Sequence, residues 1–475
     1  MSNIPVAVIA WWDAITTRRH AAILLTAYFA VAVVPLIFFR GYHSDEGLAI
    51  SIARSAVENG QWLAPHMFGV RLIERPTMLS WIVGALSLPF GEVGQAGARL
   101  TVALFLLAGC VLIYSLLRSV AASIPAAVFG VALFLACPMV LRAYVLITAD
   151  LPLSVLQLLA FWLWWRGHQG GSVGFGRWIA IGAALAVAAL MKGPQPIAFF
   201  ALGIGLYLVG SRSWRQIPGL ILAGAVCVAP IAAWYWANYR PGDETIWATF
   251  MRISPEQALA APLRAAAEQF FEMLPAALAA GAFLVGGGLR GRAGPDLRFV
   301  RATVCFAFTA AIVVLFWPGG STARYYFPMV APLCILGGLA YDRLKANRPQ
   351  AVAPVLTVVL ALLTYAAGYS AASPFMPRQF RGAKLDADRI AALVRTEPAP
   401  IHFVGAVGIN VLAYLPGPIS AVRSAALDNL AGAAWLAVPA DVADALIGRR
   451  GDAVEAKLAF GQNGEWRLLY VKPGR

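Results

Sequence analysis

The chain has 475 residues, of which 60% are hydrophobic and only 13% are charged. Soluble domains are closer to half apolar and a quarter charged, so this composition excludes an ordinary soluble protein. The net charge of +14 comes largely from connectors between apolar blocks, a pattern that positive-inside sorting produces without any ligand. We therefore expect membrane lipids and not a nucleic acid as partners.

Apolar blocks of about twenty residues, the length of a helix that crosses a bilayer, recur along the chain. The first block, 21–39, follows Arg18 and Arg19 and lacks a small-residue cleavage site, so we expect an uncleaved span. Further spans are predicted at 98–117, 121–141, 145–165, 178–191, 194–209, 217–237, 273–289, 302–317, 325–341 and 351–372. The stretch 77–90 is marginal in length. The pattern predicts an all-α polytopic membrane protein with about 11–13 transmembrane helices, and about eleven if 77–90 does not cross.

Basic connectors alternate with less basic ones, and this alternation predicts the orientation. When the basic set is assigned to the cytoplasm, the segments expected outside are 40–76, 142–150, 192–196, 238–272, 318–324 and the tail from about 374. We expect residues 1–373 to form the transmembrane domain, with 40–76 as its external first loop. Residues 374–475 are expected to form a small external α/β domain, with strands near 401–404, 434–438 and 466–471 and helices near 387–395 and 442–449.

The first external loop carries the most informative motif, Ser44-Asp45-Glu46. The apolar spacing of 46–58 predicts an amphipathic helix on the membrane surface, which Asn59-Gly60 ends. One interpretation is structural, because Ser44 can cap this helix and acidic residues favour a first turn. The other is catalytic: a carboxylate at the mouth of the membrane can act as a general base.

Other ionisable residues lie at the edges of apolar blocks. Glu74 and Arg75 close the first loop, Asp150 and Lys192 lie inside or at the edge of spans, and Arg324 precedes a Tyr-Tyr-Phe-Pro segment. Surface ion pairing can explain the first two, and snorkelling can explain the two later cations. Charges at membrane depth are nevertheless costly and are typical of functional sites.

The predicted orientation brings these residues to one membrane face. Carboxylates suit activation of an acceptor hydroxyl, and Arg and Lys suit binding of a phosphate leaving group. If the cations bind one lipid phosphate, they should surround a common point, with the general base facing the same cavity. The residues predicted on the external face are Asp45, Glu46, Glu74, Arg75, Asp150, Lys192 and Arg324.

These motifs, in this order, resemble those of the GT-C glycosyltransferases. The resemblance is to the bacterial branch of the protein O-mannosyltransferase-like superfamily (glycosyltransferase family 39 and relatives), which includes the lipid A aminoarabinose transferases. It covers roughly residues 20–345 and extends more weakly into the tail. The matching elements are Ser44-Asp45-Glu46 with the following helix and Asn59-Gly60-Gln61-Trp62, Glu74-Arg75-Pro76, Ala149-Asp150, Met191-Lys192-Gly193-Pro194 and Arg324-Tyr325-Tyr326-Phe327-Pro328.

The resemblance implies a GT-C fold and a sugar donor linked to polyprenyl phosphate. It implies a bond-forming step at the periplasmic face of a bacterial inner membrane. We expect transfer to a hydroxyl of a lipid, glycan or protein, and direct displacement by that hydroxyl would invert the anomeric configuration. Asp45 matches the catalytic aspartate, and Glu46 lies beside it. Arg75 stands where close relatives often have Lys. The residues expected to bind the donor phosphate are Arg75, Lys192, Arg324 and Tyr325, with Glu74 and Asp150 as further polar groups.

Glu74 matches an acidic position that contributes to a metal site in some members of the family. The aminoarabinose transferases also carry a histidine in the large later periplasmic loop, whereas 238–272 contains none and Arg252 is its nearest basic feature. This difference argues against a divalent metal as cofactor and against aminoarabinose as the sugar. Both stay open alternatives at the level of sequence.

Other functions are compatible with a polytopic chain. A transporter or flippase of lipid-linked sugars should show related halves and broken helices near the midplane, and no such repeat is evident. A polymerase or ligase of lipid-linked glycans would share the donor class but transfer longer chains. A membrane scaffold with a working tail would leave Asp150 and Lys192 unexplained.

Overall fold

The computed structural model describes residues 4–241, 243, 267–268, 270–288, 295–315, 323–405, 408–415, 417, 419–422, 432–461 and 464–472. The chain divides into two compact units. Unit 1 comprises Met1–Val34, Ile73–Met78 and Leu100–Ala371. Unit 2 comprises Pro35–Leu72, Leu79–Arg99 and Ala372–Arg475. The first loop and the tail therefore share unit 2, and the domain boundary expected near 373 stays a prediction.

Unit 1 is built from helices, and each span predicted for it from the apolar blocks contains at least one of them. Helix α10 packs against α9 and α12, α17 packs against α7 and α15, and α11 packs against α16. The helices are α1 (Ile4–Asp13), α2 (Arg18–Ala32), most of α6 (Gln95–Ser119), α7 (Ile124–Ala136), α8 (Pro138–Ala143), α9 (Asp150–Gln169), α10 (Phe175–Lys192), α11 (Gln195–Gly210), α12 (Ile217–Asn238), α15 (Ala276–Phe283), α16 (Pro295–Leu315), the 3₁₀ helix η4 (Ala323–Met329), α17 (Val330–Asn347) and α18 (Pro349–Ala372).

Among the described residues, six helical stretches are long and apolar enough to cross a membrane. They are Arg18–Phe39, Gln95–Ser119, Phe175–Lys192, Trp214–Asn238, Leu297–Val314 and Pro349–Phe375. Four shorter apolar helices accompany them, including Met78–Phe90, which covers the marginal stretch 77–90. Trp236 on α12 is 89% exposed, as a side chain on a lipid-facing surface can be. The chain is a multi-pass membrane protein, and the number of crossings stays a prediction.

One predicted span begins later than expected. The apolar block 145–165 predicted a continuous span, but α9 begins at Asp150 and residues 145–149 are not helical. A carboxylate is favourable in the first turn of a helix because it faces the positive end of the helix dipole. Asp150 therefore lies at a helix start and not within a span.

In unit 2 the first loop folds as predicted around a helix. Helix α4 (Glu46–Asn59) ends at Gly60, which adopts the left-handed conformation with φ 69°. Because glycine adopts this conformation without a steric penalty, Asn59-Gly60 is an effective stop. Helix α3 (Val34–Phe39) precedes the loop. The loop also contains an antiparallel pair, β1 (His66–Met67) and β2 (Val70–Arg71), and α5 (Met78–Ser87) follows it.

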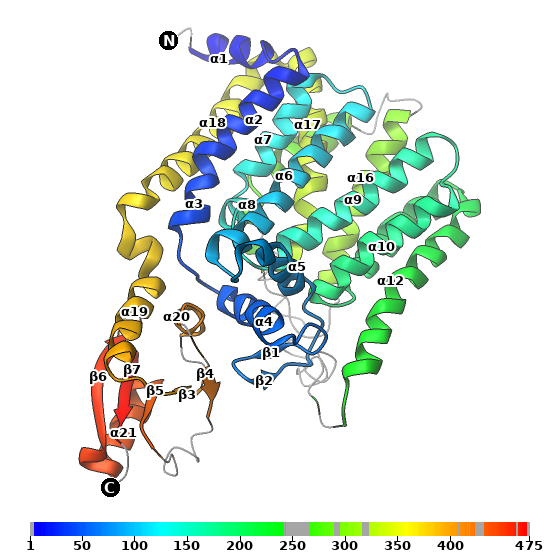
Figure 1. Ribbon diagram of the computed structural model, residues 1–475. Helices are drawn as coiled ribbons and strands as arrows, with labels where there is room; N and C mark the ends of the chain where they lie inside the picture. The colour runs from blue at the N-terminus through cyan, green and yellow to red at the C-terminus, as the bar shows by residue number, and fades with distance from the viewer. Residues whose placement is uncertain are drawn as a thin grey trace. The chain divides into compact units, whose positions relative to one another are not determined.

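The tail forms a five-stranded mixed sheet in the order β4-β3-β5-β7-β6 (Figure 1). Strand β5 lies parallel to β3 and antiparallel to β7. Side chains that alternate along β5 are buried on both faces, Trp435 with α19 on one and Leu436 with α21 on the other. The elements are α19 (Pro377–Thr396), β3 (Ile401–Phe403), α20 (Ile409–Leu412), β4 (Ile419–Ala421), β5 (Ala434–Pro439), α21 (Ala440–Arg450), β6 (Val454–Phe460) and β7 (Trp466–Val471).

The three predicted strands and both predicted helices of the tail are confirmed. The sequence interpretation missed β4 and β6, which are the two edge strands of this sheet. An edge strand is less fully buried, and β6 carries Glu455 and Lys457, so its residues lack the continuous apolar pattern that revealed β5.

Candidate active site

A buried ion pair joins two helix ends in unit 1. Asp150 opens α9 and Lys192 is the last residue of α10, and the Lys192 ammonium donates to the Asp150 carboxylate. Both side chains are buried. Each charge is favourable at its own helix end, negative at the N-terminus and positive at the C-terminus. Pairing is required because an isolated charge at this depth would be strongly destabilising.

Further cationic and aromatic groups gather around Lys192. Its Nζ atom lies 4.4 Å from the centroid of the Tyr325 ring, a cation–π contact provided by η4. The charges of Arg324 and Arg75 both act on Lys192. Lys192, Arg75 and Arg324 thus come from three distant segments of the chain to one region of unit 1. Arginine and lysine side chains brought together in this way suit binding of an anion.

The Glu-Arg-Pro segment is tied to α12. The Tyr235 hydroxyl donates to the backbone carbonyl of Glu74 at 3.0 Å, while the Glu74 side chain is exposed. Arg75 is half-buried in the next position. This contact holds the segment that carries Arg75 against a long apolar helix of the same unit.

In unit 2, Asp45 occupies the N-cap position of α4 and is exposed. Its side chain makes no capping hydrogen bond to the helix. The prediction that Ser44 caps the helix is wrong, because Ser44 precedes the cap and has a positive φ of 54°. That backbone conformation turns the chain sharply into the helix immediately before Asp45. The other part of the structural interpretation is confirmed, since Glu46 lies in the first turn of α4.

Glu46 forms a fully buried ion pair with Arg99. The Arg99 Nη2 atom lies 3.0 Å from Glu46 Oε2. The guanidinium also donates to the carbonyls of Leu36 at 3.0 Å and Gly41 at 2.8 Å, and to that of Arg40. Arg99 therefore binds both the chain that enters the loop and the first residue of α4.

His43 completes this network from within the loop. Its backbone N–H donates to Glu46 Oε2 at 2.8 Å, and its ring Nε2 contacts the Arg40 guanidinium. Burial, and next the charge of Arg40, holds the pKa of His43 below its ordinary value. The ring is therefore neutral at pH 7 and can accept a hydrogen bond from Arg40.

Tyr42 links the loop to the tail. Its ring stacks on that of Tyr414, with centroids 4.2 Å apart, and its backbone N–H donates to the Tyr414 hydroxyl at 3.0 Å. Burial raises the pKa of Tyr414 to about 12. The hydroxyl thus stays protonated and donates to Gln95 Oε1 at 2.6 Å.

Sequence reasoning missed Arg99 and Tyr414. The sequence could have indicated Arg99 as a candidate, because it is an ionisable residue at the start of the apolar block 98–117. It gave no such indication for Tyr414, since the partners of Tyr414 lie more than three hundred positions away in the chain.

In the part of the chain that the structure describes, no three His, Cys, Asp or Glu side chains gather as a metal site would require. Within the described residues, Glu74 therefore has no neighbouring ligands with which it could hold a metal ion, and the mechanism proposed below does not use a metal. Arg252 and most of the loop 238–272 lie outside the described residues.

Together these observations define a multi-pass membrane protein that carries a buried Lys192–Asp150 ion pair, on which the half-buried Arg75 and the exposed Arg324 act. Residues 74–236 match the dolichyl-phosphate-mannose-protein mannosyltransferase family. The chain is also similar to undecaprenyl phosphate-α-4-amino-4-deoxy-L-arabinose arabinosyl transferases. It is 24% identical to that of Enterobacter sp. (strain 638) over 67% of the chain, and 23% identical to that of Erwinia tasmaniensis over 73%. These alignments span 59% and 65% of the two relatives, so the chain covers less than two thirds of either length.

Solved structures share the fold. ArnT from Cupriavidus metallidurans, bound to undecaprenyl phosphate, superposes with a TM-score of 0.75 at 18% identity, covering 94% of this chain and 97% of that one. An Archaeoglobus fulgidus oligosaccharyltransferase has a TM-score of 0.55 at 12% identity, covering 89% and 68%. The chain has the GT-C fold, and its resemblance to the aminoarabinose transferases and their superfamily is confirmed.

Proposed function

We propose that the protein is a membrane glycosyltransferase that transfers a sugar from a polyprenyl-phosphate donor to an acceptor hydroxyl. The acceptor belongs to a lipid, a glycan or a protein, and transfer takes place at the periplasmic face of a bacterial inner membrane. The observation that carries the proposal is the cationic region of unit 1, where Lys192 is held by Asp150 and influenced by both Arg75 and Arg324. The similarity to transferases that use undecaprenyl-phosphate sugars supports the same donor class.

The donor phosphate is assigned to Arg75, Lys192 and Arg324. Arginine offers a planar fork of donors to phosphate oxygens, and lysine adds a compact charge. Asp150 orients the buried Lys192 through their ion pair, and the Tyr325 ring packs against the Lys192 side-chain nitrogen. These cations also stabilise the phosphate as it gains charge on leaving.

Asp45 is assigned as the general base. Its exposed carboxylate takes the proton from the acceptor hydroxyl while that oxygen attacks the anomeric carbon. The bond between the anomeric carbon and the phosphate oxygen breaks, and polyprenyl phosphate leaves with the electron pair. Direct displacement inverts the anomeric configuration. Glu46, predicted from sequence as a second catalytic residue, is buried against Arg99 and takes a positioning role in this proposal.

The cationic region can be tested by removing its buried pair. Lys192→Met combined with Asp150→Asn leaves no unpaired charge, so the protein should fold. We expect this variant to use the donor at least about tenfold less well, seen mainly as a raised donor KM, because one phosphate contact is lost. Turnover is measured with purified protein, a synthetic polyprenyl-phosphate sugar and a bacterial envelope extract that supplies lipid, glycan and protein hydroxyls as acceptors. Wild type that releases no polyprenyl phosphate in this assay would overturn the function.

A matched control is Lys472→Met, which removes an exposed lysine of the tail and should leave the donor KM unchanged. Mass spectrometry of envelope glycolipids and glycans, from cells with and without the protein, would then identify the product. An unchanged glycan profile alongside active purified protein would exclude the acceptors detected by that method.

The proposed orientation places the tail outside the cytoplasm. Ala445 lies exposed on α21, so a cysteine at this position should be accessible in the folded protein. We expect Ala445→Cys to react with a membrane-impermeant maleimide in intact spheroplasts, and the parent protein to show the background from native cysteines. Labelling that requires lysis would place the tail in the cytoplasm and invert the predicted orientation.

A further inference from the structure

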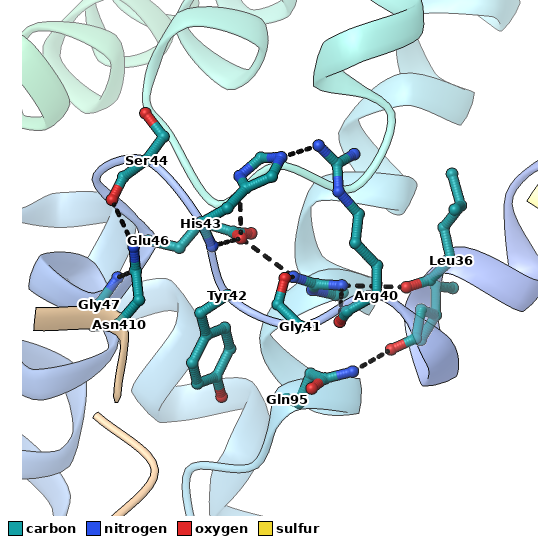
Figure 2. Close-up of polar contacts among 12 residues, drawn as sticks. Leu36, Arg40, Gly41, Tyr42, His43, Ser44, Glu46, Gly47, Gln95 and Asn410 are labelled. Carbon is teal, nitrogen blue, oxygen red and sulfur yellow. Dashed lines mark hydrogen bonds and ion pairs between the residues drawn. The ribbon is translucent and has the colours of Figure 1, made fainter. Parts of the chain in front are cut away.

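A short piece of the tail holds the loop that carries Asp45. The side-chain amide of Asn410, on α20, contacts the loop backbone on both sides of the Asp45-Glu46 pair (Figure 2). The Gly47 N–H donates to Asn410 Oδ1 at 2.8 Å, and Asn410 Nδ2 donates to the Ser44 carbonyl at 3.0 Å. One side chain thus spans the turn that presents the base.

Two glycines near this turn, Gly41 and Gly47, lie so close to the tail backbone that any larger residue would clash with it. A Cβ atom added at Gly47 would lie 2.7 Å from the backbone carbon and oxygen of Ile409. A Cβ atom at Gly41 would lie 3.0 Å from Arg381 Cα and from the Phe380 carbonyl oxygen. Glycine at both positions lets the two backbones pack directly, which fixes the loop against α20 and α19.

Other contacts surround the same turn. Arg54, on the following helix, donates to the carbonyls of Ala413 and Leu415, each at 3.1 Å. Ser44 holds a positive φ of 54°, a conformation that residues with side chains rarely adopt and that persists only when the surroundings enforce it. The bond from Asn410 to the Ser44 carbonyl is one such restraint.

We infer that Asn410 is a positioning residue for Asp45, so that the tail is a working part of the transferase. This inference rests on the proposed function. Asn410 acts through the loop backbone and does not touch the reacting groups, so its loss should affect the placement of the base more than binding of the donor. A base displaced by about 1 Å can cost on the order of a hundredfold in rate.

The test compares Asn410→Ala with Ser420→Ala in the full chain in detergent. Ser420 makes a side-chain hydrogen bond to His402 at 2.7 Å inside the tail's sheet, so its loss perturbs the tail without touching the loop. We expect Asn410→Ala to lower kcat about ten- to a hundredfold with donor KM within about twofold. Hydrogen exchange should rise across residues 42–50 in Asn410→Ala and stay at the wild-type level in Ser420→Ala.

A second variant guards against misfolding of the first. Tyr414→Phe keeps the ring that stacks on Tyr42 but removes the hydroxyl that accepts the Tyr42 amide. Tyr414→Phe should lower kcat and raise hydrogen exchange of the loop, each by a smaller factor than Asn410→Ala. Equal loss of kcat in Ser420→Ala, or unchanged kcat in Asn410→Ala, would overturn the positioning role. An inactive wild type would overturn the proposed function, while loop exchange would still decide whether Asn410 restrains the turn.

Discussion

Asp45→Asn is expected to lower turnover by at least about a hundredfold, the size of effect seen when a general base is removed. The amide keeps the shape of the side chain but cannot accept the hydroxyl proton. Because the Asp45 side chain is exposed and the amide keeps its shape, the change should leave expression and thermal unfolding near those of wild type. The measurement is kcat with purified protein at saturating donor.

Glu58→Gln provides the control for this prediction. Glu58 lies on the same helix, is exposed, and pairs with Arg54 at 3.1 Å, so the substitution removes a carboxylate of α4 without altering the loop. Its kcat should match that of wild type. If Asp45→Asn also turns over near the wild-type rate, Asp45 is not the base, and the transferase proposal rests on the cationic region alone.

Arg99→Met should be the most destabilising single substitution proposed for unit 2. It leaves the Glu46 carboxylate buried without its cation and removes the donor to the Leu36 and Gly41 carbonyls. Breaking a buried ion pair by removing one partner typically costs about 3–5 kcal/mol. We expect a large fall in the thermal unfolding temperature in detergent and a reduced yield of folded protein.

Two further variants identify the cause of this loss. Arg389→Met removes an exposed arginine that pairs with Asp386 at 3.7 Å, a surface pair expected to contribute less than about 1 kcal/mol. Combining Glu46→Gln with Arg99→Met should recover part of the lost stability, because no buried charge then lacks a partner. An Arg99→Met protein as stable as Arg389→Met would contradict the importance of the buried pair.

Local patterns in the sequence were sufficient to predict that the chain is a membrane protein and to predict much of its secondary structure. Apolar blocks long enough to cross a bilayer predicted the helices of unit 1, because a buried or lipid-facing helix must be apolar along its length. Asn59-Gly60 predicted the end of α4, since glycine readily adopts the left-handed conformation found there. Burial of β5 on both faces left a continuous apolar run that marked a strand.

The sequence also pointed to the chemically important side chains, but not to their partners. Asp150 and Lys192 stood out because each is a charge at the edge of an apolar block. Their ion pair joins positions forty-two apart, and no periodicity in the chain encodes such a contact. Glu46 likewise looked catalytic beside Asp45 until the tertiary structure placed it against Arg99.

Only the tertiary structure grouped the tail with the first loop in one unit. The contacts of Asn410 and Tyr414 with residues 42–47 cross more than 350 positions of sequence, and the bonding residues themselves are of common polar types. Composition and residue spacing indicate which helix or strand a segment can form locally. Which distant segments then pack together depends on how completely each arrangement buries apolar surface and pairs polar groups. For this protein, the sequence determined the helices and the candidate residues, and the packing decided which of those residues hold one another in place.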